Sequence, residues 1–420
     1  MKLELLTIGD ELLLGFTIDT NGAFIARELA ALGGEIVRRT SVGDDPAAIQ
    51  SAVREALDRT GAVITTGGLG PTADDMTKPA IGALFGRELY FDATQWERIL
   101  NLWKSRGRPG EPPESNKQQV MLPTGSHVLE NPLGTAPGIF LEDDRKRWVA
   151  MLPGVPREMR AMLTDRVVPL LQSSGRLGQG SVVRSLTVRT TGVAESALSD
   201  MLGVMAPGFP DASLAYLPGV DGVDLRLTVR GLASQAADQV LEQRSAAVRE
   251  SVGRFAYGVG NAELTQIVLD LCRERSLTMA VAESCTGGLL AQRLTEIPGS
   301  SDVFLGGVVA YANEIKVRLL DVPSDVIASH GAVSGEVALA MARGARERLG
   351  ASIGIGITGV AGPGGGTAEK PVGLVWIAVD FGDWSRSYSG RFFISRDEIR
   401  YRATQSALDA VRRRILFPKE

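Results

Sequence analysis

The sequence is poor in the residues that build disulfides, zinc sites and histidine-dependent active sites. Of its 420 residues only two are cysteine, Cys272 and Cys285. Two cysteines form neither a disulfide framework nor a four-cysteine zinc site, so we expect a reducing, cytoplasmic location. Two residues are histidine, His127 and His330. A Ser-His-Asp scheme would therefore have to use one of these two residues.

Membrane-spanning and nucleic-acid-binding patterns are also missing. No apolar run reaches the ~20 residues that a membrane helix needs, and we expect no signal peptide. The formal net charge is −4, so no general basic field points to direct contact with nucleic acid. Hydrophobic residues make up 44% of the chain, as in folded soluble proteins. At this length we expect about two to four domains.

Lysine is the scarce cation, with eight lysines beside 37 arginines. Arginine keeps its charge in proteins, whereas a desolvated lysine can lose its proton. A lysine in an apolar, glycine-rich setting is therefore a candidate base.

Residues 1 to about 170 alternate strand and helix patterns. Strands are expected at residues 3–8, 35–39 and 62–66, separated by amphipathic helices. This alternation predicts a parallel sheet with helices on both faces. Ligands of such sheets bind beyond the carboxyl ends of the strands.

Glycine-rich acidic loops follow all three of these strands, at residues 9–11, 43–45 and 65–75. Each loop alone is explained by an ordinary turn with an aspartate cap. Three such loops at one sheet edge favour a site for a phosphorylated ligand, with a divalent metal held by carboxylates. The sequence lacks the P-loop pattern. The expected metal ligands are Asp10, Glu11 and Asp75.

Residues 66–71, Thr-Gly-Gly-Leu-Gly-Pro, followed by Asp75 and Thr77, resemble the ligand loop of the molybdopterin-binding domain family. The resemblance implies that Asp75 and Asp44 carry chemistry. This chain has Leu69 where that family has threonine, which argues against a pterin ligand. The residues assigned to substrate binding in this domain are Thr66, Gly67, Gly68, Gly70 and Asn21.

Motifs at residues 9–15, 131–138 and 152–159, taken together with this loop, look like the first domain of the CinA family. That resemblance implies metal-dependent cleavage of ADP-ribose to AMP and ribose phosphate, with K⁺ as a further ion. The alternative is a domain without catalysis, either a pterin-cofactor carrier or an adaptor in DNA uptake.

Residues 173–256 are expected to form a smaller α+β domain with strands at 185–190 and 225–230. The pattern is KH-like, but it lacks the basic Gly-x-x-Gly loop of an RNA-binding module. We therefore interpret this domain as a spacer or dimerisation element of a homodimer.

An apolar run at residues 277–282 ends in Glu-Ser-Cys-Thr-Gly-Gly, residues 283–288, and helical spacing follows. A strand-to-helix junction exposes backbone N–H groups, which suits an anionic ligand beside a nucleophile. The alternative is a capped turn in which Cys285 is a small core residue.

If Ser284 is a nucleophile, it needs a base. His330 lies in what looks like a loop. Lys316 follows a nearly continuous apolar run, and desolvation lowers the pKa of a lysine toward the working pH. Ser284 with Lys316 is the most economical active site. The alternatives are Lys316 as a surface ion-pair cation and Cys285 as the nucleophile, although Cys285 has no evident histidine partner.

Other residues complete this expected site. Backbone N–H groups at residues 286–288 offer oxyanion donors, and Tyr311 orients the lysine or a substrate hydroxyl. The glycine-rich loop at residues 358–366 suits a phosphate, with Arg396 or Arg400 as its charge partner. The residues assigned to substrate binding are Thr286, Gly287, Gly288, Thr358, Gly359, Gly362, Gly364 and Arg396.

The motifs at residues 282–288, 311–316 and 358–363 look like the C-terminal domain of the CinA family. The resemblance implies hydrolysis of nicotinamide mononucleotide to nicotinate mononucleotide and ammonia without a cofactor. It also implies a serine nucleophile and a lysine base at Ser284 and Lys316.

We therefore expect an α/β protein of pyridine nucleotide salvage, whose two substrates are both fragments of NAD. Its domains are a three-layer α/β/α molybdopterin-binding-like domain at 1–172, the KH-like domain at 173–256 and an α/β/α deamidase domain at 257–420. The expected catalytic residues are Ser284, Lys316, Tyr311, Asp75 and Asp44.

Overall fold

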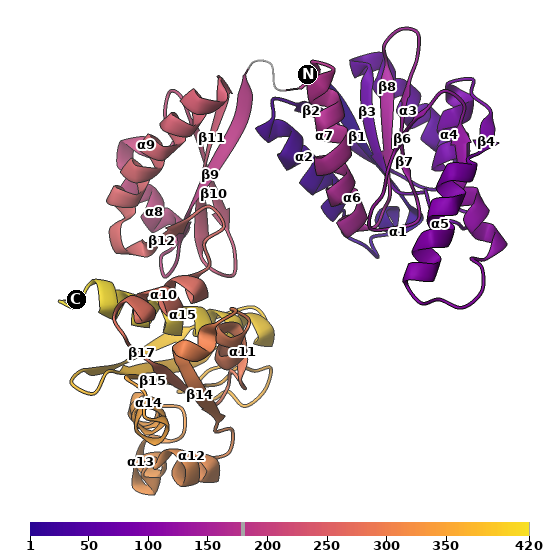
Figure 1. Ribbon diagram of the computed structural model, residues 1–420. Helices are drawn as coiled ribbons and strands as arrows, with labels where there is room; N and C mark the ends of the chain where they lie inside the picture. The colour runs from indigo at the N-terminus through magenta and orange to yellow at the C-terminus, as the bar shows by residue number, and fades with distance from the viewer. Residues whose placement is uncertain (178–180, 420) are drawn as a thin grey trace. The chain divides into compact units, whose positions relative to one another are not determined.

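The computed structural model describes residues 1–177 and 181–419. The chain forms two compact units (Figure 1). The first contains residues 1–184 with 229–238, and the second contains residues 185–228 and the chain from residue 239 onward.

The first unit is built on a six-stranded sheet in the order β2-β1-β3-β8-β7-β6. Pairing is parallel from β2 to β8 and antiparallel from β8 to β6. The expected parallel sheet therefore carries an antiparallel hairpin at one edge. Its strands are β1 (Lys2–Ile8), β2 (Glu35–Val42), β3 (Ala62–Thr66), β6 (His127–Leu129), β7 (Gly138–Glu142) and β8 (Trp148–Leu152).

Helices cover both faces of this sheet (Figure 1). Side chains alternate along a strand, so Leu5 joins the core formed with α2 and α6, while Leu6 joins the core formed with α3 and α4. The helices are α1 (Asp10–Leu13), α2 (Thr20–Ala31), α3 (Pro46–Thr60), α4 (Thr77–Leu84), α5 (Ala93–Ser105), α6 (Pro156–Met162) and α7 (Val168–Ser173). A separate two-stranded sheet joins β4 (Leu89–Phe91) to β5 (Met121–Pro123).

The middle part of the chain has four strands in the order β10-β11-β9-β12 and two helices. The strand expected at residues 225–230 lies within β11, where Leu225 and Leu227 are buried and Arg226 is exposed. The elements are β9 (Val182–Thr190), α8 (Glu195–Leu202), β10 (Ser213–Pro218), β11 (Val223–Leu232), α9 (Ser234–Val252) and β12 (Ala256–Val259).

The C-terminal part is a five-stranded sheet in the order β14-β13-β15-β16-β17. Strands β14, β13 and β15 are parallel, and β16 and β17 continue antiparallel. The strands are β13 (Met279–Glu283), β14 (Phe304–Val309), β15 (Ile353–Gly359), β16 (Leu374–Asp380) and β17 (Ser385–Arg391).

Helices α10 and α15 pack with one face of this sheet, and α12 and α14 pack with the other, which gives three layers. The helices are α10 (Leu264–Glu274), α11 (Leu289–Thr295), α12 (Asn313–Leu320), α13 (Ser324–His330), α14 (Gly335–Leu349) and α15 (Arg396–Leu416). One expectation was wrong: His330 is not in a loop but is the last residue of α13, which Gly331 ends with a positive φ of 73°.

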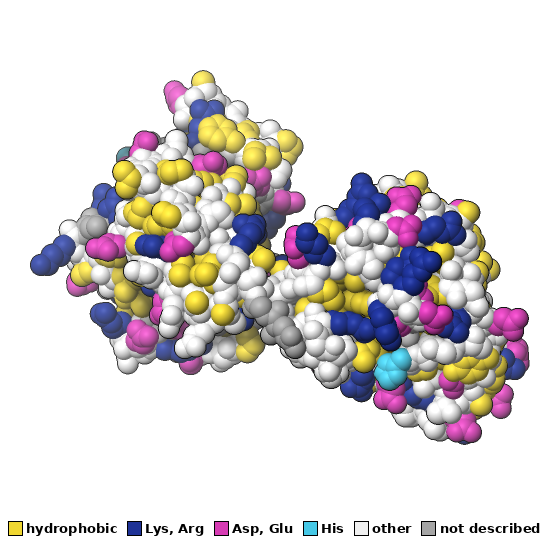
Figure 2. Space-filling view, turned by 90° about the horizontal axis from the view of Figure 1, so that it is seen from above, with side chains coloured by type: hydrophobic (Ala, Val, Ile, Leu, Met, Phe, Trp, Pro, Cys, Tyr) yellow, Lys and Arg dark blue, Asp and Glu magenta, His cyan; other side chains and the backbone are white. Residues whose placement is uncertain are grey.

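No helix within residues 1–177 and 181–419 combines the length and the apolar character that crossing a membrane requires. Acidic and basic side chains intermingle over the face that Figure 2 shows.

Candidate active sites

The first candidate site is a pocket of about 450 Å³ at the carboxyl ends of β1 and β3. It brings together almost all the residues that the sequence assigned to this domain. Those that line it are Glu11, Asn21, Asp44, Thr66, Gly67, Gly68, Gly70 and Asp75. Asp10 is outside the lining, but its backbone N–H donates to the Asp44 carboxylate at 3.0 Å.

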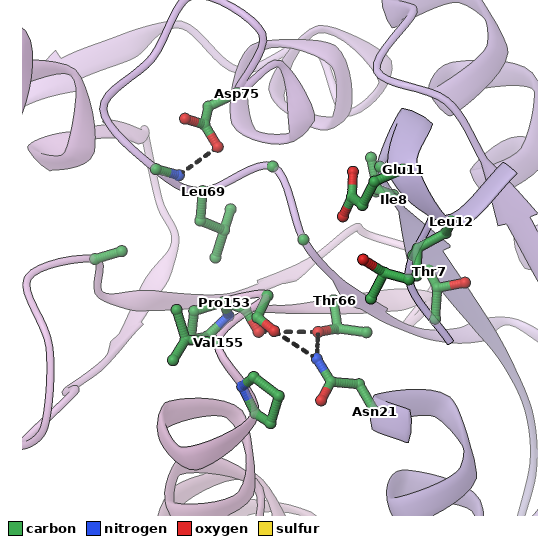
Figure 3. A pocket seen from close by; sticks show the side chains of 18 of the residues that line it. Thr7, Ile8, Glu11, Leu12, Asn21, Thr66, Leu69, Asp75, Pro153 and Val155 are labelled. Atoms are coloured by element: carbon green, nitrogen blue, oxygen red, sulfur yellow. Dashed lines mark hydrogen bonds between the residues drawn. The ribbon is translucent and has the colours of Figure 1, made fainter. Parts of the chain in front are cut away.

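Asn21 and Thr66 form one side of this pocket (Figure 3). The Asn21 amide nitrogen donates to the Thr66 hydroxyl at 3.1 Å and to the Gly154 carbonyl at 2.7 Å. The amide oxygen of Asn21 is buried and has no hydrogen-bond partner among the described residues. Since a buried polar atom is costly to leave unpaired, this oxygen is a natural acceptor for a ligand N–H or O–H group.

The loop after β3 needs its glycines. Gly67 and Gly68 have φ values of 111° and 65°, which L side chains rarely adopt. A Cβ at Gly67 would lie 2.0 Å from the Ile8 carbonyl oxygen, and one at Gly68 would lie 2.1 Å from the Thr77 hydroxyl. Both glycines are therefore required for this loop to pack against the end of β1 and the start of α4.

The Asp75 side chain fixes the conformation of this loop through hydrogen bonds. Its carboxylate accepts hydrogen bonds from the backbone N–H groups of Gly70 at 2.6 Å and Thr72 at 2.8 Å, and from the Thr72 hydroxyl at 2.5 Å. Leu69, the departure from the molybdopterin-binding pattern, is 2% exposed and packs in the core beside α3 and α4. Leu69 also lines the pocket, so this position belongs both to the core and to the pocket wall (Figure 3).

Negative charge gathers around Asp44. Burial raises the pKa of its carboxyl group, a hydrogen bond from the backbone of Asp10 opposes that effect, and the charges of Asp10, Glu11 and Asp74 raise the pKa further. A cation would relieve this repulsion. Within the described part of the chain, no three histidine, cysteine or acidic side chains are arranged as a complete metal cage. Oxygen donors of this kind nevertheless fit Mg²⁺, which commonly takes one or two carboxylates and completes its shell with ligand phosphates and water.

Two buried polar side chains of this domain, neither of which lines the pocket, were not singled out from the sequence. Asn131 is buried and organises the loop after β6, because its side chain donates to the Glu158 carboxylate at 2.7 Å and accepts from the Gly134 N–H at 2.9 Å. Lys78 is 1% exposed and donates to the Gln118 carbonyl at 2.5 Å. Burial lowers the pKa of Lys78 to about 8, although the negative charge of Asp75 opposes the shift.

The second candidate site lies where β13, β14 and β15 end together. Glu283, the last residue of β13, pairs with Val309 on β14 and with Ile357 on β15. Ser284 follows at once, and its backbone N–H donates to the Ile357 carbonyl at 2.9 Å. Because parallel strands end at the same sheet edge, residues from three distant segments meet here.

The Lys316 amine lies 3.2 Å from the Ser284 hydroxyl oxygen. It is also 2.8 Å from the Ala310 carbonyl and 3.4 Å from the Tyr311 carbonyl. Carbonyl oxygens only accept hydrogen bonds, so they take two N–H groups of a neutral amine. In the neutral amine this leaves the lone pair available to the Ser284 hydroxyl, to which the protonated amine donates instead. Lys316 is 1% exposed, and burial lowers its pKa, while the charges of Cys285 and Glu314 oppose the shift.

Glu283 is a residue whose role the sequence did not reveal. Its buried carboxylate accepts hydrogen bonds from the backbone N–H groups of Gly288 at 3.1 Å, Leu290 at 3.1 Å and Ala291 at 2.8 Å. It therefore caps α11 from the preceding strand. A carboxylate just before a helix start was the available signal.

This cap changes the expected oxyanion donors. The Gly288 N–H donates to Glu283, and the Gly287 N–H donates to the Ser284 carbonyl at 3.1 Å. Two of the three proposed donors are thus already engaged. The Thr286 hydroxyl is buried with no partner among the described residues, while its carbonyl accepts from the Arg400 guanidinium at 2.7 Å.

Tyr311 and Arg396 meet at the edge of this site. The Arg396 guanidinium donates to the Gly362 carbonyl at 2.6 Å and to the Tyr311 hydroxyl at 3.2 Å. Arg396 therefore joins the glycine-rich loop to the segment before α12. Tyr311 contacts the lysine through its backbone carbonyl, whereas its side chain is 62% exposed.

The other loop residues differ in how closely they are held. Thr358 is buried and its hydroxyl donates to the Ala332 carbonyl at 2.7 Å. A Cβ at Gly359 would lie 2.6 Å from the Leu374 carbonyl oxygen, so glycine is required there. Gly364 is exposed, and a Cβ there would meet no atom within 4 Å.

Cys285 is poorly suited to act as a nucleophile. It is 5% exposed, and burial raises the pKa of its thiol to about 12. Since the thiolate is the reactive form, this environment disfavours it. His330 is exposed, and its ring nitrogen lies 3.6 Å from the Glu336 carboxylate.

Comparison with protein families gives three matches. They are the CinA C-terminal domain at residues 261–415, the probable molybdopterin binding domain at residues 4–173 and the damage-inducible protein CinA KH domain at residues 185–258. A CinA-like protein of Gemmatimonas aurantiaca is 59% identical over 414 residues, covering 98% of this chain and 96% of that protein. The chain belongs to the CinA family.

Other CinA proteins are similar over all or part of the chain. A CinA-like protein of Chlorobaculum tepidum is 45% identical over 383 residues, covering 90% of this chain and 89% of that protein. A solved structure of CinA from Thermoplasma acidophilum is 35% identical and covers 40% of this chain and 97% of that chain, with a TM-score of 0.37. The CinA matches confirm the expected class, an α/β protein with molybdopterin-binding-like, KH-like and CinA C-terminal parts.

Proposed function

We propose that the C-terminal domain is a Ser-Lys amidase that hydrolyses nicotinamide mononucleotide to nicotinate mononucleotide and ammonia. The observation that carries this proposal is the 3.2 Å approach of the Lys316 amine to the Ser284 hydroxyl, with two carbonyls fixing the other directions of the amine. A serine hydroxyl becomes nucleophilic only beside a base, and a buried lysine with a lowered pKa meets that need.

The reaction proceeds in two halves. The Ser284 oxygen bonds to the carboxamide carbon while Lys316 takes the hydroxyl proton. Collapse of the tetrahedral intermediate breaks the carbon–nitrogen bond, and Lys316 returns the proton to the departing nitrogen, which leaves as ammonia. Water then attacks the acyl-Ser284 ester with Lys316 again as the base. Nicotinate mononucleotide leaves and Ser284 regains its proton.

Arg396 and Arg400 are the positive charges available for the phosphate of this substrate. Both lie in the first turns of α15, and both also hold backbone carbonyls, at Gly362 and Thr286 respectively. A guanidinium has five N–H donors, so each can hold its carbonyl and still contact a phosphate oxygen.

Ammonia release from nicotinamide mononucleotide by the full chain tests this proposal. Ser284→Ala and Lys316→Met should each abolish release while circular dichroism shows a folded protein. Lys370→Met is the matched lysine control, because its exposed amine donates to the His330 carbonyl rather than to the dyad. Full activity in Ser284→Ala would refute the nucleophile, and no activity in the parent would refute the amidase.

We propose that the first domain cleaves the pyrophosphate bond of ADP-ribose to give AMP and ribose phosphate. The gathering of Asp10, Glu11, Asp44 and Asp74 supports a divalent cation here, together with phosphate groups. Bound there, the metal would neutralise charge on the pyrophosphate oxygens. The loop at residues 66–70 lines the pocket, and the Asn21 amide oxygen, which has no partner among the described residues, is an acceptor available to the ligand.

AMP release from ADP-ribose in the presence of Mg²⁺, with and without K⁺, tests this second activity. Asp44→Asn should lower turnover, and EDTA should abolish it. Ligand binding without turnover would favour a carrier or adaptor role for this domain. The homodimer, the cytoplasmic location and the lack of direct nucleic-acid contact stay predictions.

A further inference from the structure

The C-terminal half contains a cavity whose lining includes neither Ser284 nor Lys316. Its volume is about 490 Å³, within the range of small-molecule sites. Strand β17 and the last turns of α15 supply most of its wall, and residues 191–192 with Arg254 close the remaining side. None of the residues assigned to the amidase lines it.

The wall of this cavity is rich in positive charge. Among the described residues, its lining includes four arginines, Arg254, Arg386, Arg413 and Arg414, and one carboxylate, Asp409. Arg413 and Arg414, together with the adjoining Arg412, outnumber this carboxylate.

Asp409 already forms ion pairs with two guanidinium groups. Asp409 lies 2.7 Å from the guanidinium of the fully buried Arg412 and 2.7 Å from that of Arg413. Arg412 also donates to the carbonyls of Arg254 and Ala256, so it links α15 to the segment at residues 254–256. One carboxylate facing two guanidinium groups leaves a net positive charge in a partly desolvated place, where charge acts strongly.

Aromatic rings hold the arginines at this wall. The Arg414 guanidinium lies 4.8 Å from the centre of the Trp384 ring, and that of Arg386 lies 5.5 Å from the centre of the Tyr388 ring. The ion pairs of the described residues give Arg414 no carboxylate partner. Burial raises the pKa of Tyr388, and the charges of Arg386, Arg413 and Arg414 oppose that rise, which places three cations around one hydroxyl.

Flat apolar surface lies beside these charges. The lining also contains Ile377, Trp384, Phe392 and Phe417. A ligand that satisfies both parts of the wall combines an aromatic ring with a concentrated negative charge, because aromatic faces stack on rings and guanidinium planes while guanidinium groups bind phosphate.

We propose that this cavity is a second nucleotide site, which binds the base and the phosphates of a nucleoside diphosphate. Its guanidinium groups contact the phosphates, and its aromatic side chains and Ile377 contact the base. The site is separate from the amidase pair and does not depend on either proposed activity.

Photo-crosslinking of 8-azidoadenosine diphosphate to the full chain tests the location. Peptide mapping should place label on residues 384–392 or 409–418, and excess ADP should suppress it. Label confined to the loop at residues 66–75 or to the Ser284 region would overturn the proposal. Those two outcomes also separate this site from the proposed substrate sites.

A matched pair of arginine variants tests the contacts. Arg414→Gln should reduce labelling of the cavity peptides at least about 10-fold, the loss expected for one charge-assisted phosphate contact. Arg343→Gln, an exposed arginine on α14 at the opposite face of the sheet, should label like the parent. Equal labelling in the parent and Arg414→Gln would refute the site, provided that circular dichroism shows the variant folded.

Discussion

The Lys316 amine lies 3.2 Å from the Ser284 hydroxyl oxygen although 32 residues separate them in the chain. Ser284 follows strand β13, and Lys316 lies on helix α12 after strand β14. The two side chains meet because β13 and β14 are parallel neighbours. The carbonyls of Ala310 and Tyr311 complete the surroundings of the amine. This arrangement leads to the first prediction.

Ammonia release should rise with pH until Lys316 has lost its proton. Burial lowers the pKa of Lys316 from its ordinary value of 10.5, so the plateau should begin below that pH. A base works only in its unprotonated form, which sets the sign of the dependence. Lys316→Arg keeps a permanent charge and should lower kcat by about 10²- to 10⁴-fold at every pH. A parent whose rate falls through this range as pH rises would contradict the assignment.

Glu283→Gln should destabilise the protein and slow the amidase. Replacing the buried carboxylate by an amide weakens three hydrogen bonds to α11, with an expected cost of about 1–3 kcal/mol. Ser284, the next residue, should then lose its fixed position. Denaturant unfolding and ammonia release measure the two effects. Glu296→Gln is the control, because that exposed carboxylate accepts from the Gln292 side chain and, among the described residues, forms no hydrogen bond with Ser284 or Lys316.

Neither cysteine should react with iodoacetamide at pH 8 in the folded protein. Burial raises the pKa of both the Cys272 and the Cys285 thiols to about 12, which leaves almost no thiolate. Mass spectrometry should find both alkylated after unfolding in urea. Cys285→Ala should retain ammonia release, and rapid alkylation of native Cys285 with loss of activity would instead favour the thiol as nucleophile.

Lys78→Met should remove a pH dependence of stability. Burial lowers the pKa of Lys78 from 10.5 to about 8 in the folded chain. Between these values the unfolded chain binds more protons, so the free energy of unfolding rises with pH. The rise is at most about 1.4 kcal/mol per pH unit. Urea denaturation at pH 7.5, 8.5 and 9.5 should therefore show the parent gaining stability relative to the variant, and parallel profiles would disprove the shift.

Much of this arrangement could be predicted because it is local. The apolar run before Glu283 and the helical spacing after Gly288 predicted β13 and α11. The scarcity of lysine directed attention to Lys316, whose burial follows from the apolar residues around it. The parallel sheet then predicted that the loops after β1, β2 and β3 share one edge, as the pocket lining shows.

The rest depended on side chains that reach across the fold. The Glu283 carboxylate accepts hydrogen bonds from the backbone amides of α11, and only its place before the helix start indicated this role in the sequence. The Gly288 N–H, an expected oxyanion donor, is engaged by this carboxylate, while the Gly287 N–H donates to the Ser284 carbonyl. Leu69, the departure in the ligand loop, lines the pocket and also packs in the core beside α3 and α4, a second contact that the motif alone did not indicate. Asn131 and Glu158 meet only because the strands between them fold back.

Helix α15 runs unbroken from Arg396 to Leu416. At about 1.5 Å per residue, its 21 residues extend about 30 Å. One end contacts the hydroxyl of Tyr311, and the other carries Arg414 into the arginine-rich cavity. One unbroken helix therefore supplies residues to two chemically different places, Arg396 beside Tyr311 and Arg414 beside Trp384.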